Sequence, residues 1–142
     1  MDYRIRRNKN ELDSTGYIEI GPGRYSGQHW QDGFLFVWED AFGMAEGILA
    51  KHFPAYDHLG INDVPREIGI RIISEWREVA RKLKEITPSE AHRALELPNW
   101  YLPGLETEIS AHWEEIAAML RDISDECDCY YRQGDWICIL GM

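Results

Sequence analysis

Hydrophobic side chains in the last third of the chain recur with the period of an α-helix, and this periodicity constrains the fold more than any other feature of the sequence. They come at steps of three and four residues: Ile109, Trp113, Ile116, Leu120, Ile123 and Cys127. Side chains spaced in this way lie on one face of a helix, which must be buried against another element. The sequence therefore predicts a long amphipathic helix over residues 105–126.

A second stripe with the same period lies in the middle of the chain. Its members are Ile68, Ile72, Trp76, Val79, Leu83 and Ile86. Asp63 is placed to cap this helix, and Pro65 to lie in its first turn. Because Trp76 and Trp113 each lie at the centre of a stripe, we expect both indoles to face the same core.

Two shorter helices are also indicated. Residues 87–90, Thr-Pro-Ser-Glu, end the second helix and begin a short one that runs through Leu95. Residues 38–54 have helical hydrophobic spacing as far as a closing proline. Gly43 and Gly47 each cost this helix up to about 1 kcal/mol relative to alanine. Packing against the rest of the protein must therefore hold it.

Three segments indicate β-structure. Residues 17–20 alternate between polar and apolar side chains, and residues 34–37 form a continuous apolar run. The tail, residues 129–140, predicts a hairpin with a two-residue loop at either Gln133-Gly134 or Gly134-Asp135. These two loops give pairing registers that differ by one residue, and both remain open.

The expected fold is a single α+β domain spanning residues 1–142. A chain of 142 residues has the size of one domain, and 44% hydrophobic residues are enough to build a core. Most of the predicted elements are helical. We therefore expect helices packed on a small, mainly antiparallel sheet that ends in a C-terminal β-hairpin.

The charge of the chain limits its partners. It has 25 acidic and 15 basic residues, which gives a net charge of −10 and a pI near 4.9. Binding to phosphate backbones or to anionic membranes needs clustered Lys and Arg, so neither nucleic acid nor a membrane is expected as a partner.

No apolar run approaches the roughly 20 residues of a membrane span, and the cationic N-terminus is not followed by a signal-peptide core. We expect a cytoplasmic protein.

The sequence favours neither a metal site nor a cofactor site. Cys127, Cys129 and Cys138 lack a second closely spaced pair and a nearby histidine, so free thiols are expected instead of a zinc site. Residues 21–23, Gly-Pro-Gly, lack the third glycine and the following helix of a dinucleotide-binding loop.

No catalytic motif occurs in its required context, and we therefore expect no catalytic residues. The alternative is a small hydrolase-like enzyme that uses His29, Asp32 and Glu39, which lie near one another in sequence.

Two groups of carboxylates are candidates for binding a partner. The first lies on the outward face of the long helix: Glu108, Glu115, Asp122, Asp125 and Glu126. The second lies earlier in the chain: Asp32, Glu39, Asp40, Glu46 and Asp57. Either group could be a solvated surface that keeps the protein soluble, or a negative surface that attracts a basic partner. The denser charge on the long helix favours that face.

One part of the chain resembles a known group of proteins. Residues 17–36, YIEIGPGRYSGQHWQDGFLF, and residues 51–58, KHFPAYDH, resemble bacterial immunity proteins. These are encoded beside polymorphic toxins, including those of contact-dependent growth inhibition systems. The resemblance covers about a third of the chain and does not extend to residues 61–142, which would then include the surface that selects the toxin.

The resemblance implies binding without catalysis. Such a protein binds the C-terminal toxin domain of its effector, often a nuclease, and blocks the active site or the substrate groove. A nuclease must present a basic groove to phosphates, so an acidic inhibitor is electrostatically complementary to it. A general acidic adaptor protein is a further alternative.

Overall fold

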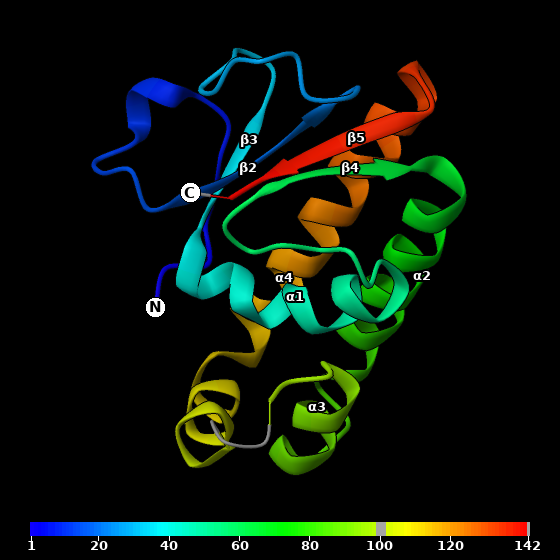
Figure 1. Ribbon diagram of the computed structural model, residues 1–142. Helices are drawn as coiled ribbons and strands as arrows, with labels where there is room; N and C mark the ends of the chain where they lie inside the picture. The colour runs from blue at the N-terminus through cyan, green and yellow to red at the C-terminus, as the bar shows by residue number, and fades with distance from the viewer. Residues whose placement is uncertain (99–101, 142) are drawn as a thin grey trace.

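A five-stranded antiparallel sheet forms one layer of the protein, and helices form the other (Figure 1). The computed structural model describes residues 1–98 and 102–141. The strands are β1 (Ile5–Arg6), β2 (Tyr17–Pro22), β3 (Leu35–Trp38), β4 (Ile61–Pro65) and β5 (Trp136–Leu140), in the spatial order β1-β3-β2-β5-β4. The helices are α1 (Glu39–His52), α2 (Arg66–Lys82), α3 (Pro88–Ala94) and α4 (Leu102–Gln133), with a short 3-10 turn at Lys9–Glu11.

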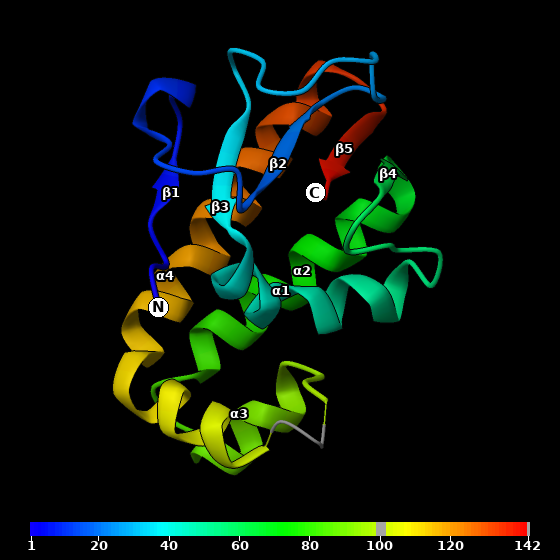
Figure 2. The same ribbon diagram turned by 60° about the vertical axis from the view of Figure 1, so that its left-hand side comes forward.

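The main core lies between the sheet and three of the helices. Ile18 and Ile20, alternate residues of β2, are fully buried in this core. Strand β2 contacts α1 and α4, and α4 passes behind β2 and β3 in Figure 2. Tyr17 and Glu19, which alternate with them, are buried on the other face. Glu19 is bonded there by His29 and by the backbone N–H of Trp30, both in the loop between β2 and β3, whereas the Tyr17 hydroxyl donates to Asp13, before β2. Helix α3 packs on α4 at the end of the molecule away from the sheet (Figure 1). The predicted α+β class is confirmed.

The helical stripes occupy the core as predicted. On α4 the stripe residues Ile109, Ile116 and Leu120 are buried, although the backbone of this helix departs from helical geometry at His112. Trp76 on α2 is fully buried, whereas Trp113 is only partly buried and packs against the edge of the same core. The shared core is therefore confirmed, with the two indoles at different depths.

The predicted C-terminal hairpin is wrong. Residues 129–133 are the last turns of α4, and only β5 is a strand, inserted between β2 and β4. The helical stripe continues past Cys127, and tertiary contacts fix its end. Tyr130 donates a hydrogen bond to the Gly33 carbonyl (2.8 Å), and Tyr131 donates one to the Val64 carbonyl (3.0 Å).

Asp63 does not cap α2, in contrast to the sequence prediction. It lies within β4, opposite Cys138 on β5, and its carboxylate accepts a hydrogen bond from the backbone N–H of Tyr25 at 2.8 Å. Helix α2 begins at Arg66, directly after Pro65, which has extended backbone angles. Pairing with β5 thus overrides the local capping preference of an aspartate.

Candidate functional site

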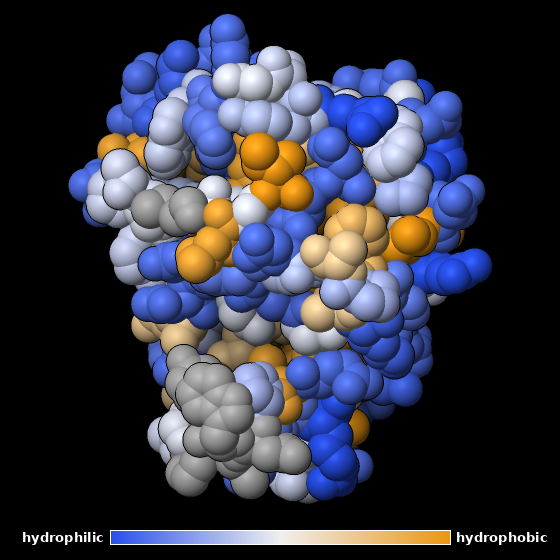
Figure 3. Space-filling view, viewed as in Figure 1, coloured by the Kyte–Doolittle hydropathy of each residue, from blue (hydrophilic) through white to orange (hydrophobic). Residues whose placement is uncertain are grey.

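A hollow of about 570 Å³ lies beside α1. Its walls come from the outward side of α1, from the segment that contains Tyr56 and His58, from Leu97 and Pro98 after α3, and from Leu105 on α4. In the space-filling view this face of the protein is largely polar, and apolar side chains show in small separate patches, one of them just below α1 (Figure 3). The hollow therefore combines an apolar lining with a polar surrounding surface.

Helix α1 supplies most of the lining. Most of its contributions recur at helical spacing and belong to its less buried side: Glu39, Asp40, Gly43, Glu46, Gly47 and Ala50. Met44, which is buried, also reaches the lining. The opposite side of the same helix, including Phe42 and Ile48, is fully buried in the main core. Amphipathicity thus orients α1 so that its carboxylates and glycines face the hollow.

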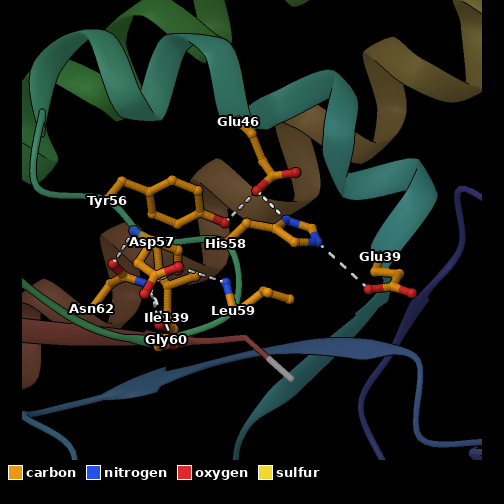
Figure 4. Close-up of polar contacts among 9 residues, drawn as sticks. All are labelled: Glu39, Glu46, Tyr56, Asp57, His58, Leu59, Gly60, Asn62 and Ile139. Atoms are coloured by element: carbon orange, nitrogen blue, oxygen red, sulfur yellow. Dashed lines mark hydrogen bonds and ion pairs between the residues drawn. The ribbon is translucent and has the colours of Figure 1, made fainter.

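A hydrogen-bonded cluster forms one rim of the hollow. His58 contacts Glu46 through Nδ1 at 2.6 Å and Glu39 through Nε2 at 3.5 Å (Figure 4). The Tyr56 hydroxyl donates a second hydrogen bond to Glu46 at 2.5 Å, to the same carboxylate oxygen. Burial and the neighbouring Glu46 carboxylate raise the pKa of Tyr56, so this phenol remains a hydrogen-bond donor.

Asn62 holds the loop that carries the cluster. Its side chain exchanges two hydrogen bonds of 2.8 Å with the backbone of Asp57, and it donates a third to the Ile139 carbonyl on β5 at 3.0 Å. Asn62 is itself buried, so these bonds form away from water. The position of His58 is consequently tied to the sheet.

The charge state of His58 depends on its two carboxylate neighbours. Burial by itself lowers the pKa of His58, but the hydrogen bond and negative charge of Glu46, together with the charge of Glu39, raise it above the usual 6.5. A pKa raised by folding means that protonated His58 stabilises the folded state. This stabilisation is complete below about pH 6.5 and is lost as the pH rises through the folded-state pKa.

We expect Glu46→Gln to lower the pKa of His58, because it removes the closer of the two negative charges. Proton NMR of the His58 ring against pH measures this directly. Urea unfolding of both proteins should show a stability difference that is larger at pH 6 than above the folded-state pKa of His58. An unchanged His58 titration in the variant would contradict the role of Glu46.

All carboxylates of the early acidic group except that of Asp32 lie in or beside the hollow. Glu39, Asp40 and Glu46 line the hollow, and Asp57 lies beside it, where its carboxylate accepts the backbone N–H of Leu59. Asp32 is not part of the site. Its side chain is 93% exposed, and its nearest cation is Lys9, at 3.9 Å.

Most carboxylates of the acidic group on α4 are bonded to a basic group or a hydrogen-bond donor of the same chain. Each of four carboxylates has an intramolecular partner: Glu108 accepts from the Tyr3 hydroxyl, Glu115 pairs with His112, Asp125 with Arg77, and Glu126 with Arg7. Asp122 is exposed on the same helix. These partners reduce the negative field that the sequence predicted for this face.

The three residues of the alternative enzyme site are separately engaged. His29 bonds to the buried carboxylate of Glu19 at 2.6 Å, Asp32 lies near Lys9, and Glu39 faces His58.

The sequence prediction missed Tyr56 and His58 as partners of Glu46. They are 10 and 12 residues away from it along the chain, a separation that has no recognisable period.

The cysteines are free thiols in the structure, with Cys127 and Cys138 buried and Cys129 exposed. Burial raises the pKa of the Cys127 thiol, and it raises that of Cys138 to about 12.

Within residues 1–98 and 102–141, no three His, Cys, Asp or Glu side chains are grouped so that they could hold a metal ion. Over the same residues, no helix is both long and apolar enough to cross a membrane.

Comparison of the chain with protein-family models, with curated proteins and with solved structures gives no match.

Proposed function

We propose that this protein is a cytoplasmic immunity protein that neutralises the C-terminal toxin domain of an effector by one-to-one binding. The observation that carries the proposal is the hollow beside α1, where three carboxylates surround an apolar lining. Protein-binding surfaces commonly have an apolar centre that anchors the partner and a polar rim. Tyr56 and His58 of the lining belong to the stretch 51–58 that resembles immunity proteins, and the lining residues of α1 lie between that stretch and residues 17–36.

The charge of the hollow suits a toxin that acts on nucleic acid. Such a toxin needs a basic groove for phosphates, and carboxylates on an inhibitor can take the place of those phosphates. Glu39 and Asp40 lie in the first turn of α1, and neither pairs with a Lys or Arg in the described part of the chain. The carboxylates of α4 are less suitable, because Asp125 and Glu126 already pair with Arg77 and Arg7.

The proposal is tested with the toxin domain encoded immediately upstream of this protein. We expect the two purified proteins to form a 1:1 complex in analytical ultracentrifugation, and the complex to lack the activity of the free toxin. If the upstream frame encodes no secreted effector, or if its terminal domain neither binds nor is inhibited, the proposed function is wrong.

Charge reversal distinguishes the two acidic groups. We expect Glu39→Lys/Asp40→Lys to slow association with the toxin by about tenfold and to flatten its salt dependence, because long-range attraction raises association rates. The matched control is Glu115→Lys/Asp122→Lys on α4, which should change the rate much less. Stopped-flow measurements at several salt concentrations give both values. The reverse ranking would assign the interface to α4.

The cluster around His58 favours a second candidate function, acid–base catalysis on a substrate bound in the hollow. A histidine held between two carboxylates in a concave site is an arrangement that general bases use. Stoichiometry separates the two candidates. An inhibitor protects only when it is present in at least equal amounts with the toxin, whereas an enzyme that modified the toxin would inactivate it at far lower ratios.

A further inference from the structure

Gly43 is a glycine in the middle of α1 that its surroundings do not require. Its φ angle is not in the left-handed region, and a Cβ built on it would meet no atom within 4 Å. Glycine inside a helix lowers stability by up to about 1 kcal/mol relative to alanine. The chain therefore accepts a weaker helix at a position where any small side chain would fit.

Gly47, one turn later, provides the contrast. A Cβ there would lie within 3 Å of the backbone carbonyl oxygens of Leu95 and Glu96, so close packing of α1 on the end of α3 explains this glycine. No such packing explains Gly43. What it leaves is space, because Gly43 lines the hollow and any side chain there would project into it.

The rim of the hollow has carboxylate oxygens available for a ligand. Tyr56 and His58 both bond to Oε2 of Glu46, which leaves Oε1 without a partner among the described residues (Figure 4). Asp40 is exposed and has no hydrogen bond or ion pair within residues 1–98 and 102–141. The basic groups that line the hollow are His58, held between Glu46 and Glu39, and the Met1 ammonium, which lies 3.8 Å from Glu108. Negative charge therefore dominates the rim.

The lining below this rim is apolar. It includes Met44, Ala50, Leu97 and Leu105, beside the open space at Gly43. A ligand that matches both parts needs an apolar stem and a positively charged end. Among protein side chains, only arginine and lysine have this build, and both bury their methylenes while the charged end stays at a polar surface.

We propose that the hollow receives one arginine or lysine side chain of the partner protein. The methylene groups lie over Gly43, and the cationic end pairs with Asp40 and with the free oxygen of Glu46. The missing side chain at position 43 gives the stem its room. This inference rests on the proposed function for the identity of the partner, but the chemistry of the hollow is testable without the toxin.

The first test uses small probes and nitrogen-15 NMR of the whole protein. N-acetyl-arginine-N-methylamide and its lysine counterpart should shift the amide signals of Gly43, Gly47 and His58 in a saturable way, with one of them binding at least tenfold more tightly than the norleucine analogue, which lacks the charge. Gly43→Leu should abolish the shifts by filling the hollow, while the same substitution at Gly104, an exposed helical glycine outside the lining of the hollow, should retain them. Equal response to norleucine, shifts elsewhere on the protein, or no saturable shift for either cation would overturn the proposal.

The second test uses the toxin domain encoded upstream. Gly43→Leu should weaken its binding at least tenfold, whereas Gly104→Leu, outside the hollow, should bind within about twofold of the wild type. Thermal unfolding serves as the folding control, since neither variant should melt below the wild type. Tight binding by Gly43→Leu would overturn the inference and leave the immunity function standing. Binding of the cationic probes by a protein that ignores the toxin would instead refute the immunity function alone.

Discussion

Replacing Trp76 with alanine should lower the free energy of unfolding by about 3–5 kcal/mol, the range for removal of a large aromatic side chain from a core. Trp76 is 1% exposed, and its indole N–H donates a hydrogen bond to the Ala45 carbonyl of α1 at 3.0 Å. The substitution leaves a cavity and also removes this hydrogen bond. Because domains are stable by only about 5–15 kcal/mol, the variant should be close to unfolding at 37 °C.

Urea unfolding followed by circular dichroism measures this loss. Trp113→Ala is the matched control, because the same atoms are removed from a partly buried site at the edge of the core. We expect a clearly smaller loss for Trp113 than for Trp76. A loss at Trp76 of less than about 1 kcal/mol would mean that α2 does not pack as described here.

Two glycines in α1 should respond to alanine with opposite signs. Gly43→Ala should raise stability by about 0.5–1 kcal/mol, because alanine restricts the unfolded chain and its Cβ enters open space. Gly47→Ala should lower stability by about 1–3 kcal/mol, because its Cβ would collide with the backbone after α3. Both variants replace glycine with alanine in the same helix, so the contribution of helix propensity cancels when their stabilities are compared. The difference reports tertiary packing alone.

Paired urea titrations of the two variants measure this difference. If both were stabilised by the same amount, α3 would not touch α1 at Gly47. If Gly43→Ala were destabilised, the open space beside Gly43 would be filled in solution, and the inference about the hollow would lose its main support.

The helices follow from local pattern to a large extent. The stripe containing Ile116 and Leu120 predicted α4, and the stripe containing Ile72 and Trp76 predicted α2, because burial of one helix face requires this period. Hydrophobic spacing also placed α1, and the Thr-Pro-Ser-Glu signal at residues 87–90 placed α3, close to their observed positions. Periodic hydrophobicity is a short-range property, so it can be seen in the sequence without any knowledge of the partner surface.

Local pattern failed where two distant segments decide between helix and strand. Tyr130 and Tyr131 have β-propensity and precede a turn-like Gly134, yet they are helical because their hydroxyls reach the backbone at Gly33 and Val64. Asp63 has the character of a helix cap, yet it lies in β4 because β5 pairs with it. In both cases a contact made across more than 60 residues outweighs a local preference.

The candidate site divides in the same way. The sequence by itself determined the acidic character of the protein and identified Glu39, Asp40 and Glu46 as candidates, since charge and helical spacing are local. Only the tertiary structure joined them to Tyr56 and His58, set Asp32 apart, and gave most of the α4 candidates partners within the same chain. The physical reason is that hydrogen bonds and ion pairs depend on which surfaces meet. For this hollow, the pairing of β4 with β5 and the hydrogen bonds of Asn62 to Asp57 and Ile139 decide it.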